Sequence, residues 1–246
     1  GELACGTVGP GRLADTGKIL EMARILLAEK ILSGRKVVVS AGPTAEDIDP
    51  VRFLTNRASG KMGFAMAVVA QRFGAEVTLV AGPTRLPDPP FLKIERVRSA
   101  KEMMSAVVSA GESADVVVMA AAVADARPET VSPQKIRKEN LHRDLKLVPT
   151  DDILASLGRA KRSRVLVGFA AETTDLAGNA LEKMKRKNLD AIVANDVSRT
   201  DIGFDSDSNE VRMYFSDGTA LDLAMAAKEA IASAIWRAVC KKLLPA

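Results

Sequence analysis

The apolar residues of this chain follow two alternating patterns, which predict strands and helices in turn. Nearly continuous apolar runs occupy Lys36–Ala41, Glu76–Ala81 and Asp115–Val123. Runs of this kind are typical of strands that are buried on both faces of a sheet. Between them, Lys61–Phe73 and Ser99–Ala110 carry apolar residues at helical spacing. The first half of the chain therefore predicts βαβ units.

The same alternation continues into the second half of the chain. Strands are predicted at Lys93–Val97, Arg164–Phe169 and Asp190–Asn195, and helices at Asp151–Leu157 and Asp175–Lys187. The dipeptide Asp217-Gly218 between two further short strands, Glu210–Phe215 and Thr219–Leu223, is a strong hairpin signal. A closing helix runs to about Lys242, with Ile231, Ile235 and Val239 on one face. The order favours an α/β fold: a Rossmann-like, doubly wound, mainly parallel sheet with a C-terminal β-hairpin extension.

Three parts of the chain differ in pattern. Residues 1–14 are glycine-rich and without periodicity, which predicts a tail, and residues 15–35 contain a linker helix that Asp15 or Thr16 caps and Gly34 ends. Residues 36–246 form one domain without a separating linker. Its one long irregular stretch, Ala126–Pro149, is polar, and a loop of that length in a compact fold is usually functional or disordered.

Composition removes several functional classes. The 246 residues carry a formal charge of +4, 47% hydrophobic residues, 2 Cys and 1 His. The scarcity of aromatic residues argues against a stacking surface for nucleic acid, and no apolar stretch reaches the ~20 residues of a membrane span. One His and two Cys argue against a His/Cys zinc site, and a Ser-His-Asp triad would have to use His142, to which we give no role. The two distant cysteines indicate a reducing, cytoplasmic protein.

The loops after the predicted strands carry the candidate chemistry, because ligands of open α/β sheets lie beyond the carboxyl ends of the strands. Gly42 follows the first strand. Ser59, Gly60 and Gly63 then open a helix, where backbone amides and the helix dipole can bind a phosphate. An ordinary capped helix start is the simpler interpretation of the same residues. The familiar phosphate-loop patterns are absent.

Charged residues near other strand ends are open to two interpretations each. Asp125 ends an apolar strand, where a carboxylate serves a metal ion, a ribose or a helix cap. The cluster Lys135–Lys138 and the helical pair Lys183 and Lys187 are either solvated cations or ligands for a polyphosphate. Phe169 is either a core residue or a stacking partner for a base. Together they favour a nucleotide-binding α/β domain with little acid–base equipment.

An ordered set of motifs resembles a known family. The set consists of Gly42–Thr44, Asp49–Arg52, Asn56–Gly63, Ala120–Asp125, Lys135–Lys138, Gly168–Glu172, Arg186–Asn188 and Ala194–Asp196. It resembles bacterial phosphopantothenoylcysteine synthetase, the second half of the bifunctional coenzyme A biosynthesis flavoprotein. The segment around Cys5 resembles the end of the decarboxylase half, so residues 1–14 are expected to be the tail of that domain and the chain to be a fragment of a longer protein. FMN would belong only to the missing half.

The resemblance implies a ligase that joins 4′-phosphopantothenate to cysteine. CTP would activate the carboxylate as an acyl-cytidylate, with Mg²⁺ neutralising the triphosphate, and the enzyme would be a homodimer. Asn56 would hold the activated acyl group, Lys135 would stabilise charge on the α-phosphate, and Arg52 would bind the substrate phosphate. The residues implied at CTP are Gly42, Ser59, Gly60, Gly63, Met119, Ala120, Ala121, Asp125, Asp151, Asp152, Ile153, Leu154, Phe169, Lys183 and Lys187, with Asp125 also at the metal.

Two alternatives make different predictions. A Rossmann-type oxidoreductase would carry a glycine fingerprint after the first strand and a Tyr-x-x-x-Lys pair, and Tyr214 is followed four residues later by Gly218. A non-catalytic nucleotide-sensing module would bind CTP and tolerate the loss of Asn56 and Lys135.

Overall fold

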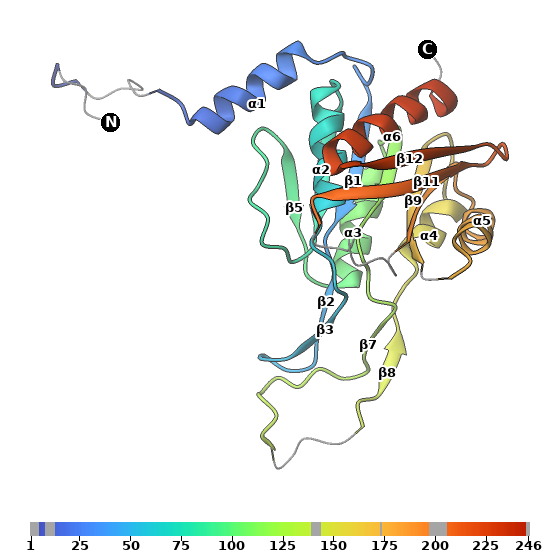
Figure 1. Cartoon of the computed structure of the whole chain (residues 1–246). Helices are drawn as coiled ribbons and strands as arrows, with labels where there is room; N and C mark the ends of the chain where they lie inside the picture. Colours follow the sequence, from blue (N-terminus) through green and yellow to red (C-terminus); the bar gives the residue numbers. More distant parts are fainter. Residues whose placement is uncertain (1–4, 8–12, 139–143, 173, 197–205, 245–246) are drawn as a thin grey trace.

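An 8-stranded sheet forms the centre of the computed structural model, which describes residues 5–7, 13–138, 144–172, 174–196 and 206–244 (Figure 1). The strand order is β12-β11-β10-β9-β6-β1-β4-β5. The strands are β1 (Lys36–Ala41), β4 (Glu76–Ala81), β5 (Lys93–Arg96), β6 (Val116–Met119), β9 (Val165–Glu172), β10 (Ala191–Asp196), β11 (Ser208–Phe215) and β12 (Ala220–Ala227).

The topology of this sheet is that of a doubly wound fold. The strands from β5 to β10 are parallel, and β11 and β12 add an antiparallel hairpin at one edge. Numbered along the chain, the parallel strands lie in the order 3-2-1-4-5-6, the order of the Rossmann fold. The order reverses between β1 and β6, so the crevice for a ligand is expected at their carboxyl ends. The predicted fold class is confirmed, including the hairpin.

Helices cover both faces of the sheet. The covering helices are α2 (Lys61–Arg72), α3 (Ala100–Gly111), α4 (Ile153–Arg159), α5 (Leu176–Arg186) and α6 (Lys228–Leu243), and α1 (Thr16–Leu27) precedes the first strand. On one face, α2 and α6 pack over β1, β4 and β11, and the buried Trp236 of α6 donates its indole N–H to the Met66 carbonyl of α2 at 2.8 Å. On the other face, α3, α4 and α5 close a second apolar cluster.

Two short antiparallel pairs project from the body as an arm, which lies at the bottom of Figure 1. The first pair is β2 (Ala45–Asp47) with β3 (Phe53–Thr55), and the second is β7 (Ala126–Pro128) with β8 (Leu147–Pro149). We use "arm" for residues 45–55, 126–138 and 144–149. The prediction of an irregular stretch over 126–149 was therefore wrong at both ends, and β2 and β3 were not predicted.

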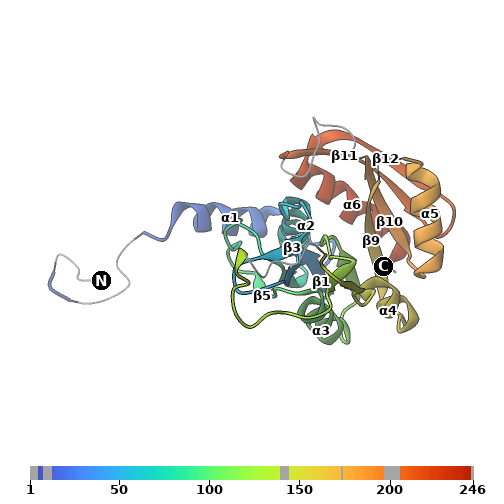
Figure 2. The ribbon, with the colours of Figure 1, turned by 90° about the horizontal axis from the view of Figure 1, so that it is seen from below.

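Two predicted elements end earlier than expected. The strand predicted over Asp115–Val123 ends at Met119, because the chain then crosses toward Gly42, whose carbonyl accepts from the Ala122 N–H at 2.9 Å. The linker helix begins with the predicted Asp15 cap but ends at Leu27 and not at Gly34. Its apolar residues Ile19 and Leu26 are exposed, and the helix reaches away from the sheet (Figure 2).

Three expectations drawn from composition concerned the two cysteines, a membrane span and His142. Cys5 and Cys240 are both free thiols. Within the described ranges, no helix has the length and apolar character that crossing a membrane requires. His142 lies outside the described residues.

Candidate functional site

A pocket of about 650 Å³ lies at the carboxyl edge of the sheet, where the strand order reverses between β1 and β6. The loops after β1 and β6, the carboxyl-end residues of β9 and β10, the start of β11, the last turn of α5 and the first turns of α2, α4 and α6 contribute to it. The sequence-predicted residues that line it are Asn56, Gly42, Ser59, Gly60, Gly63, Met119, Ala120, Ala121, Asp125, Asp151, Asp152, Ile153, Leu154, Phe169, Lys183 and Lys187.

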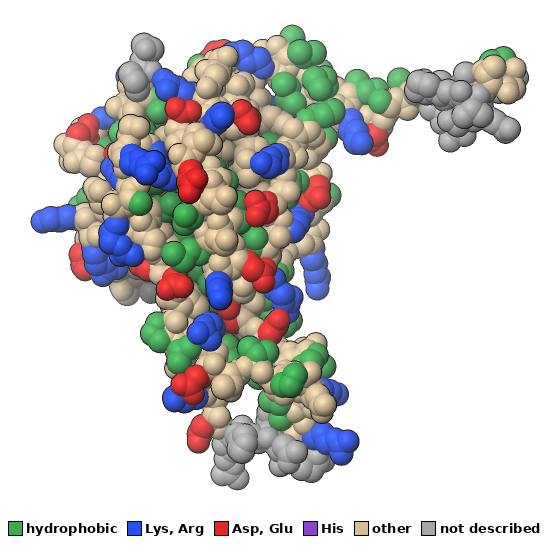
Figure 3. Space-filling view, turned by 180° about the vertical axis from the view of Figure 1, so that it is seen from behind, with side chains coloured by type: hydrophobic (Ala, Val, Ile, Leu, Met, Phe, Trp, Pro, Cys, Tyr) green, Lys and Arg blue, Asp and Glu red, His purple; other side chains and the backbone are tan. Residues whose placement is uncertain are grey.

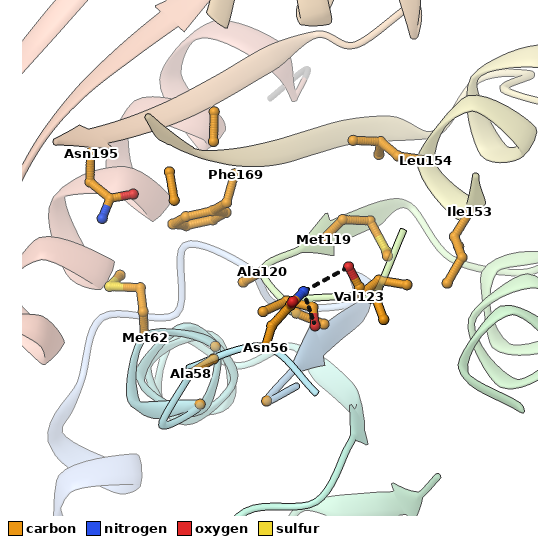
Figure 4. A pocket seen from close by; sticks show the side chains of 18 of the residues that line it. Asn56, Ala58, Met62, Met119, Ala120, Val123, Ile153, Leu154, Phe169 and Asn195 are labelled. Atoms are coloured by element: carbon orange, nitrogen blue, oxygen red, sulfur yellow. Dashed lines mark hydrogen bonds between the residues drawn. The ribbon is translucent and has the colours of Figure 1, made fainter. Parts of the chain in front are cut away.

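The pocket is elongated, and its two ends come from different elements (Figure 4). Ile153 and Leu154 of α4 lie at one end, and Met62 of α2 and Asn195 of β10 lie at the other, with Phe169 and Asn56 between them. A ligand in this pocket would lie across the carboxyl ends of several strands.

Glycines allow the close approach of α2 to the sheet. A Cβ on Gly63 would lie 2.5 Å from the Ala41 Cβ, so no other residue fits there without movement. Gly60 precedes the helix at φ +83°, in the left-handed region that favours glycine. The predicted glycine-rich turn thus brings a helix N-terminus to the pocket, and Gly60 provides no capping side chain for it.

Asn56 is fixed by two backbone carbonyls beyond β6. Its Nδ2 donates to the Ala122 carbonyl at 3.3 Å and to the Val123 carbonyl at 3.1 Å (Figure 4). Reversing the amide would set its oxygen against two carbonyl oxygens, so the orientation is determined. The side-chain oxygen is therefore the polar group that Asn56 can present to a ligand.

Charged groups hold the α4 end of the pocket together. Asp152 caps α4 through the Ala155 N–H at 2.9 Å, and its carboxylate lies 2.9 Å from Lys187 Nζ. Although desolvation opposes ionisation, these hydrogen bonds hold the pKa of Asp152 below its usual value. Lys183 Nζ donates to the Phe169 carbonyl at 2.9 Å. Lys183 and Lys187 therefore attach the end of α5 to two parts of the pocket wall, the backbone of β9 and the cap of α4.

The structure places Arg52 and Lys135 on the arm, outside the pocket lining. They are joined through Asp49, which is 1% exposed. Its carboxylate accepts from the N–H groups of Val51 and Arg52, both at 2.8 Å, and from the Ile136 N–H at 3.2 Å. Arg52 Nη2 also donates to the Ile136 carbonyl at 3.2 Å. The turn that carries Arg52 and the segment that carries Lys135 are therefore one unit.

Several lining residues were not assigned from the sequence. The polar ones are Arg57, Lys61, Thr150, Asn195, Asn209 and Lys228. Lys61 and Asn195 belong to the quoted motifs and could have been found from their place after strand ends. Asn209 and Lys228 come from the C-terminal hairpin and the last helix, far from any nucleotide motif, and no local pattern marks them.

A pocket at the switch point of a 3-2-1-4-5-6 sheet defines a Rossmann-like α/β protein that binds its ligand at the carboxyl edge of the strands. Residues 32–243 match the family described as DNA/pantothenate metabolism flavoprotein C-terminal domain, and the chain belongs to that family. The resemblance inferred from the motifs is thereby confirmed.

Named relatives agree with this assignment. The chain is 44% identical over 246 residues to coenzyme A biosynthesis bifunctional protein CoaBC of Vibrio cholerae, covering 99% of this chain and 61% of that protein. It is 46% identical to the CoaBC of Bacillus subtilis, covering 93% and 57%. It thus spans about three fifths of these relatives. A crystal structure of the CoaBC C-terminal domain matches with a TM-score of 0.76 and 41% identity, covering 87% of this chain and 98% of that domain.

Proposed function

We propose that this chain is a CTP-dependent phosphopantothenate–cysteine ligase. The observation that carries the proposal is the pocket itself. Residues from six of the eight motifs, from Gly42 to Asn195, meet in one cavity at the switch point of the sheet. The names of the similar proteins place them in coenzyme A biosynthesis.

The proposed reaction has two steps. A carboxylate oxygen of 4′-phosphopantothenate attacks the α-phosphorus of CTP, the bond to the bridging oxygen breaks, and pyrophosphate leaves. The amine of cysteine then attacks the acyl carbon of the acyl-cytidylate, CMP leaves, and the amine loses a proton. The product is 4′-phosphopantothenoylcysteine. Such chemistry requires positioning and charge neutralisation more than strong acid–base groups, in agreement with a chain that contains 1 His.

The residues divide into two groups by position. Asn56 lies in the middle of the pocket and would contact the activated carboxyl group, while the residues at the α4 end and Phe169 would bind the nucleoside. Lys135 and Arg52 would approach from the arm, as the cation at the α-phosphate and the contact for the pantetheine phosphate. Because the arm is separate from the pocket, both roles need a closed arm or a second subunit.

Asp125 is the candidate protein ligand for Mg²⁺. Its exposed side chain lines the pocket, and its backbone carbonyl accepts from the Thr150 N–H at 3.0 Å, which holds it beside Asp151. Within the described ranges, no group of three or more His, Cys, Asp or Glu forms a metal cluster. Mg²⁺ commonly uses one or two carboxylates together with substrate phosphates, so Asp125 fits this pattern. The ion would neutralise triphosphate charge.

The arm is the candidate dimer interface. Val51, Phe53, Val131, Leu145 and Leu147 are exposed on it, and hydrophobic side chains are visible on this projection in Figure 3. An apolar surface on a projecting element suits a homodimer. FMN is not expected in this chain, and neither nucleic acid nor a membrane is an expected partner. A cytoplasmic location stays a prediction.

The test is a direct assay of the purified chain. With CTP, Mg²⁺, 4′-phosphopantothenate and cysteine, we expect release of pyrophosphate and CMP together with the amide product, measured by coupled spectroscopy and mass spectrometry. Omission of cysteine should stop amide formation. Absence of pyrophosphate release with CTP and with ATP would reject the ligase function. Release with ATP alone would correct the nucleotide.

A further inference from the structure

We propose that Thr84 is a positioning residue, which orients the Ser59–Gly60 peptide so that the Gly60 N–H faces the pocket as a donor to the nucleotide. Thr84 lies in the loop between β4 and β5 and does not itself line the pocket. This loop repeats at residues 82–84 the Gly-Pro-Thr sequence that follows β1 at residues 42–44. The inference rests on the proposed ligase function and adds to it a residue that acts through a neighbouring backbone group.

The first observation is the direction of the hydrogen bond that the Thr84 hydroxyl makes. Its Oγ1 donates to the Ser59 carbonyl at 3.1 Å and accepts from the Leu86 N–H at 3.0 Å. Because a backbone N–H can only donate, the Leu86 contact uses a lone pair of Oγ1 and leaves the hydroxyl proton for the Ser59 carbonyl. The hydroxyl therefore links the β4–β5 loop to the turn that precedes α2.

The second observation is the orientation of the Ser59–Gly60 peptide. Every peptide bond in the described ranges is trans, and in a trans peptide the carbonyl and the following N–H point in opposite directions. Since the Ser59 carbonyl is directed at Thr84, the Gly60 N–H points away from the β4–β5 loop. Ser59 and Gly60 line the pocket and Thr84 does not, so this N–H is directed to the pocket side.

Gly60 is also a residue at which the peptide could rotate. Its φ is +83°, and glycine adopts positive and negative φ with similar ease, so no side chain of its own holds the preceding peptide in one orientation. A rotated peptide would direct the Ser59 carbonyl into the pocket, where it would repel the oxygen atoms of an anionic ligand. The rotation would also take the acceptor away from the Thr84 hydroxyl. The hydroxyl therefore favours the orientation that presents a donor.

The loop that carries Thr84 is attached at both of its ends. A Cβ on Gly82 would lie 1.8 Å from the Pro43 carbonyl oxygen, so the two Gly-Pro-Thr loops are in direct contact. At the other end of the loop, the Phe91 carbonyl accepts from Gln71 Nε2 of α2 at 2.5 Å. These attachments give the Thr84 hydroxyl a defined position relative to the start of α2.

The experiment compares Thr84→Val, which removes the hydroxyl at nearly constant shape, with Thr84→Ser, which keeps it. Thr84 is partly exposed, so the folded chain should tolerate both side chains. In calorimetry of the whole chain with Mg²⁺, the CTP dissociation constant of Thr84→Val should rise about fivefold, the effect of losing one hydrogen bond. Thr84→Ser should bind CTP like the wild type. In turnover, Thr84→Val should raise KM for CTP and leave kcat within about twofold, because an interaction in the ground state is lost.

Three controls separate the orientation of this peptide from the general stability of the loop. The affinity for 4′-phosphopantothenate should be the same in Thr84→Val and in the wild type. Gln71→Met removes the contact at the other end of the loop, keeps the Thr84 hydroxyl and should leave the CTP affinity unchanged. Thr219→Val removes a hydroxyl that donates to the Asp217 carboxylate in the hairpin turn, and it should also bind CTP like the wild type.

The outcomes distinguish the role of Thr84 from the ligase function. An unchanged CTP affinity in Thr84→Val would overturn the positioning role even if the wild type is an active ligase. An equal loss of CTP affinity in Thr84→Ser or Gln71→Met, or an equal loss of 4′-phosphopantothenate affinity, would also overturn it. A selective loss of CTP affinity in a chain that forms no amide product would keep the role and reject the ligase function. A wild type that binds no CTP would overturn both.

Discussion

The side-chain amide of Asn56 donates to the backbone carbonyl of Val123 at 3.1 Å, which ties the loop before α2 to the chain that leaves β6. The loop before α2 follows the β2–β3 pair that continues from β1, and the other loop follows β6, so the two loops belong to the strands on either side of the switch point. The contact therefore sets the spacing of the two walls in the middle of the pocket. It also commits Nδ2, so that Asn56 offers an oxygen to the ligand.

Asn56→Asp should abolish most ligase activity without unfolding the protein. The substitution keeps the shape but places an oxygen against the Ala122 and Val123 carbonyls, so the side chain must turn away. A misplacement of about 1 Å at a reacting centre can cost ~10²-fold in rate, and we expect a loss of at least that size. Product formation with saturating CTP measures it, with Asn179→Asp on α5 as the control. Wild-type turnover in Asn56→Asp would contradict the role.

Lys135→Gln should slow pyrophosphate release by roughly 10²–10³-fold, the usual effect of removing a group that stabilises transition-state charge. Lys135 is exposed on the arm, so its loss should leave the fold unchanged. Lys146→Gln removes another exposed cation of the arm, one that pairs with Glu129, and serves as the matched control. If both variants release pyrophosphate at the wild-type rate, Lys135 has no catalytic role. Recovery of activity on mixing Lys135→Gln with Asn56→Asp would show that Lys135 serves a second subunit.

Val131→Asp should convert a homodimer into a monomer. Val131 is exposed on the arm, so a carboxylate is tolerated by the folded chain but is costly to bury in an interface. Light scattering after size exclusion measures the mass. Leu13→Asp introduces the same charge at an exposed apolar residue before α1, and this control should leave the mass unchanged. A Val131→Asp variant that keeps a dimeric mass would reject the arm as the interface.

The sheet was predictable because its strands are buried on both faces. Such runs as Lys36–Ala41 stand out at once, and the structure reproduces their bounds. The strand predicted over Asp115–Val123 was too long, because Ala120–Val123 are as apolar as a strand but form part of the pocket wall. The three-residue pairs of the arm contain too few residues for any periodicity, so β2 and β3 could not be found.

The site was predictable only in part. The order of the motifs predicted that the residues after the parallel strands lie close together, because the carboxyl ends of parallel strands meet at one edge of the sheet. It could not show that Lys135 lies on the arm, since that depends on a single buried carboxylate, Asp49. It also could not place Asn209, because an antiparallel strand reaches the same edge with its beginning and not its end.

Gly158→Ala should weaken nucleotide binding from a position outside the pocket. A Cβ at Gly158 would lie 2.0 Å from the Lys187 carbonyl oxygen, so α4 and the end of α5 must separate. Overpacking of this kind typically costs about 1–3 kcal/mol, and here it displaces Lys187 from Asp152. We expect a raised KM for CTP and reduced thermal stability. Gly17→Ala in α1, far from the pocket, is the control, and an unchanged KM would show that this packing does not position Lys187.

Asp49→Asn should loosen the arm at neutral pH and lose its effect in acid. Burial opposes ionisation of Asp49, but backbone N–H groups of Val51, Ile136 and Arg52 hold the pKa of its carboxyl below the usual value of about 3.9. Because the carboxyl has a lower pKa in the folded chain than in the unfolded chain, its ionisation stabilises the fold. This stabilisation is fully present above the pKa of the unfolded chain and is lost as the pH falls through the pKa of the folded chain. The free energy of unfolding of the wild type should therefore exceed that of Asp49→Asn at pH 7, and the difference should shrink below about pH 4.

Urea unfolding across this pH range measures the difference, with Asp144→Asn, which changes an exposed carboxylate of the same arm, as the control. A difference that grows toward acid would contradict the hydrogen-bonded carboxylate as the link between Arg52 and the Lys135 segment.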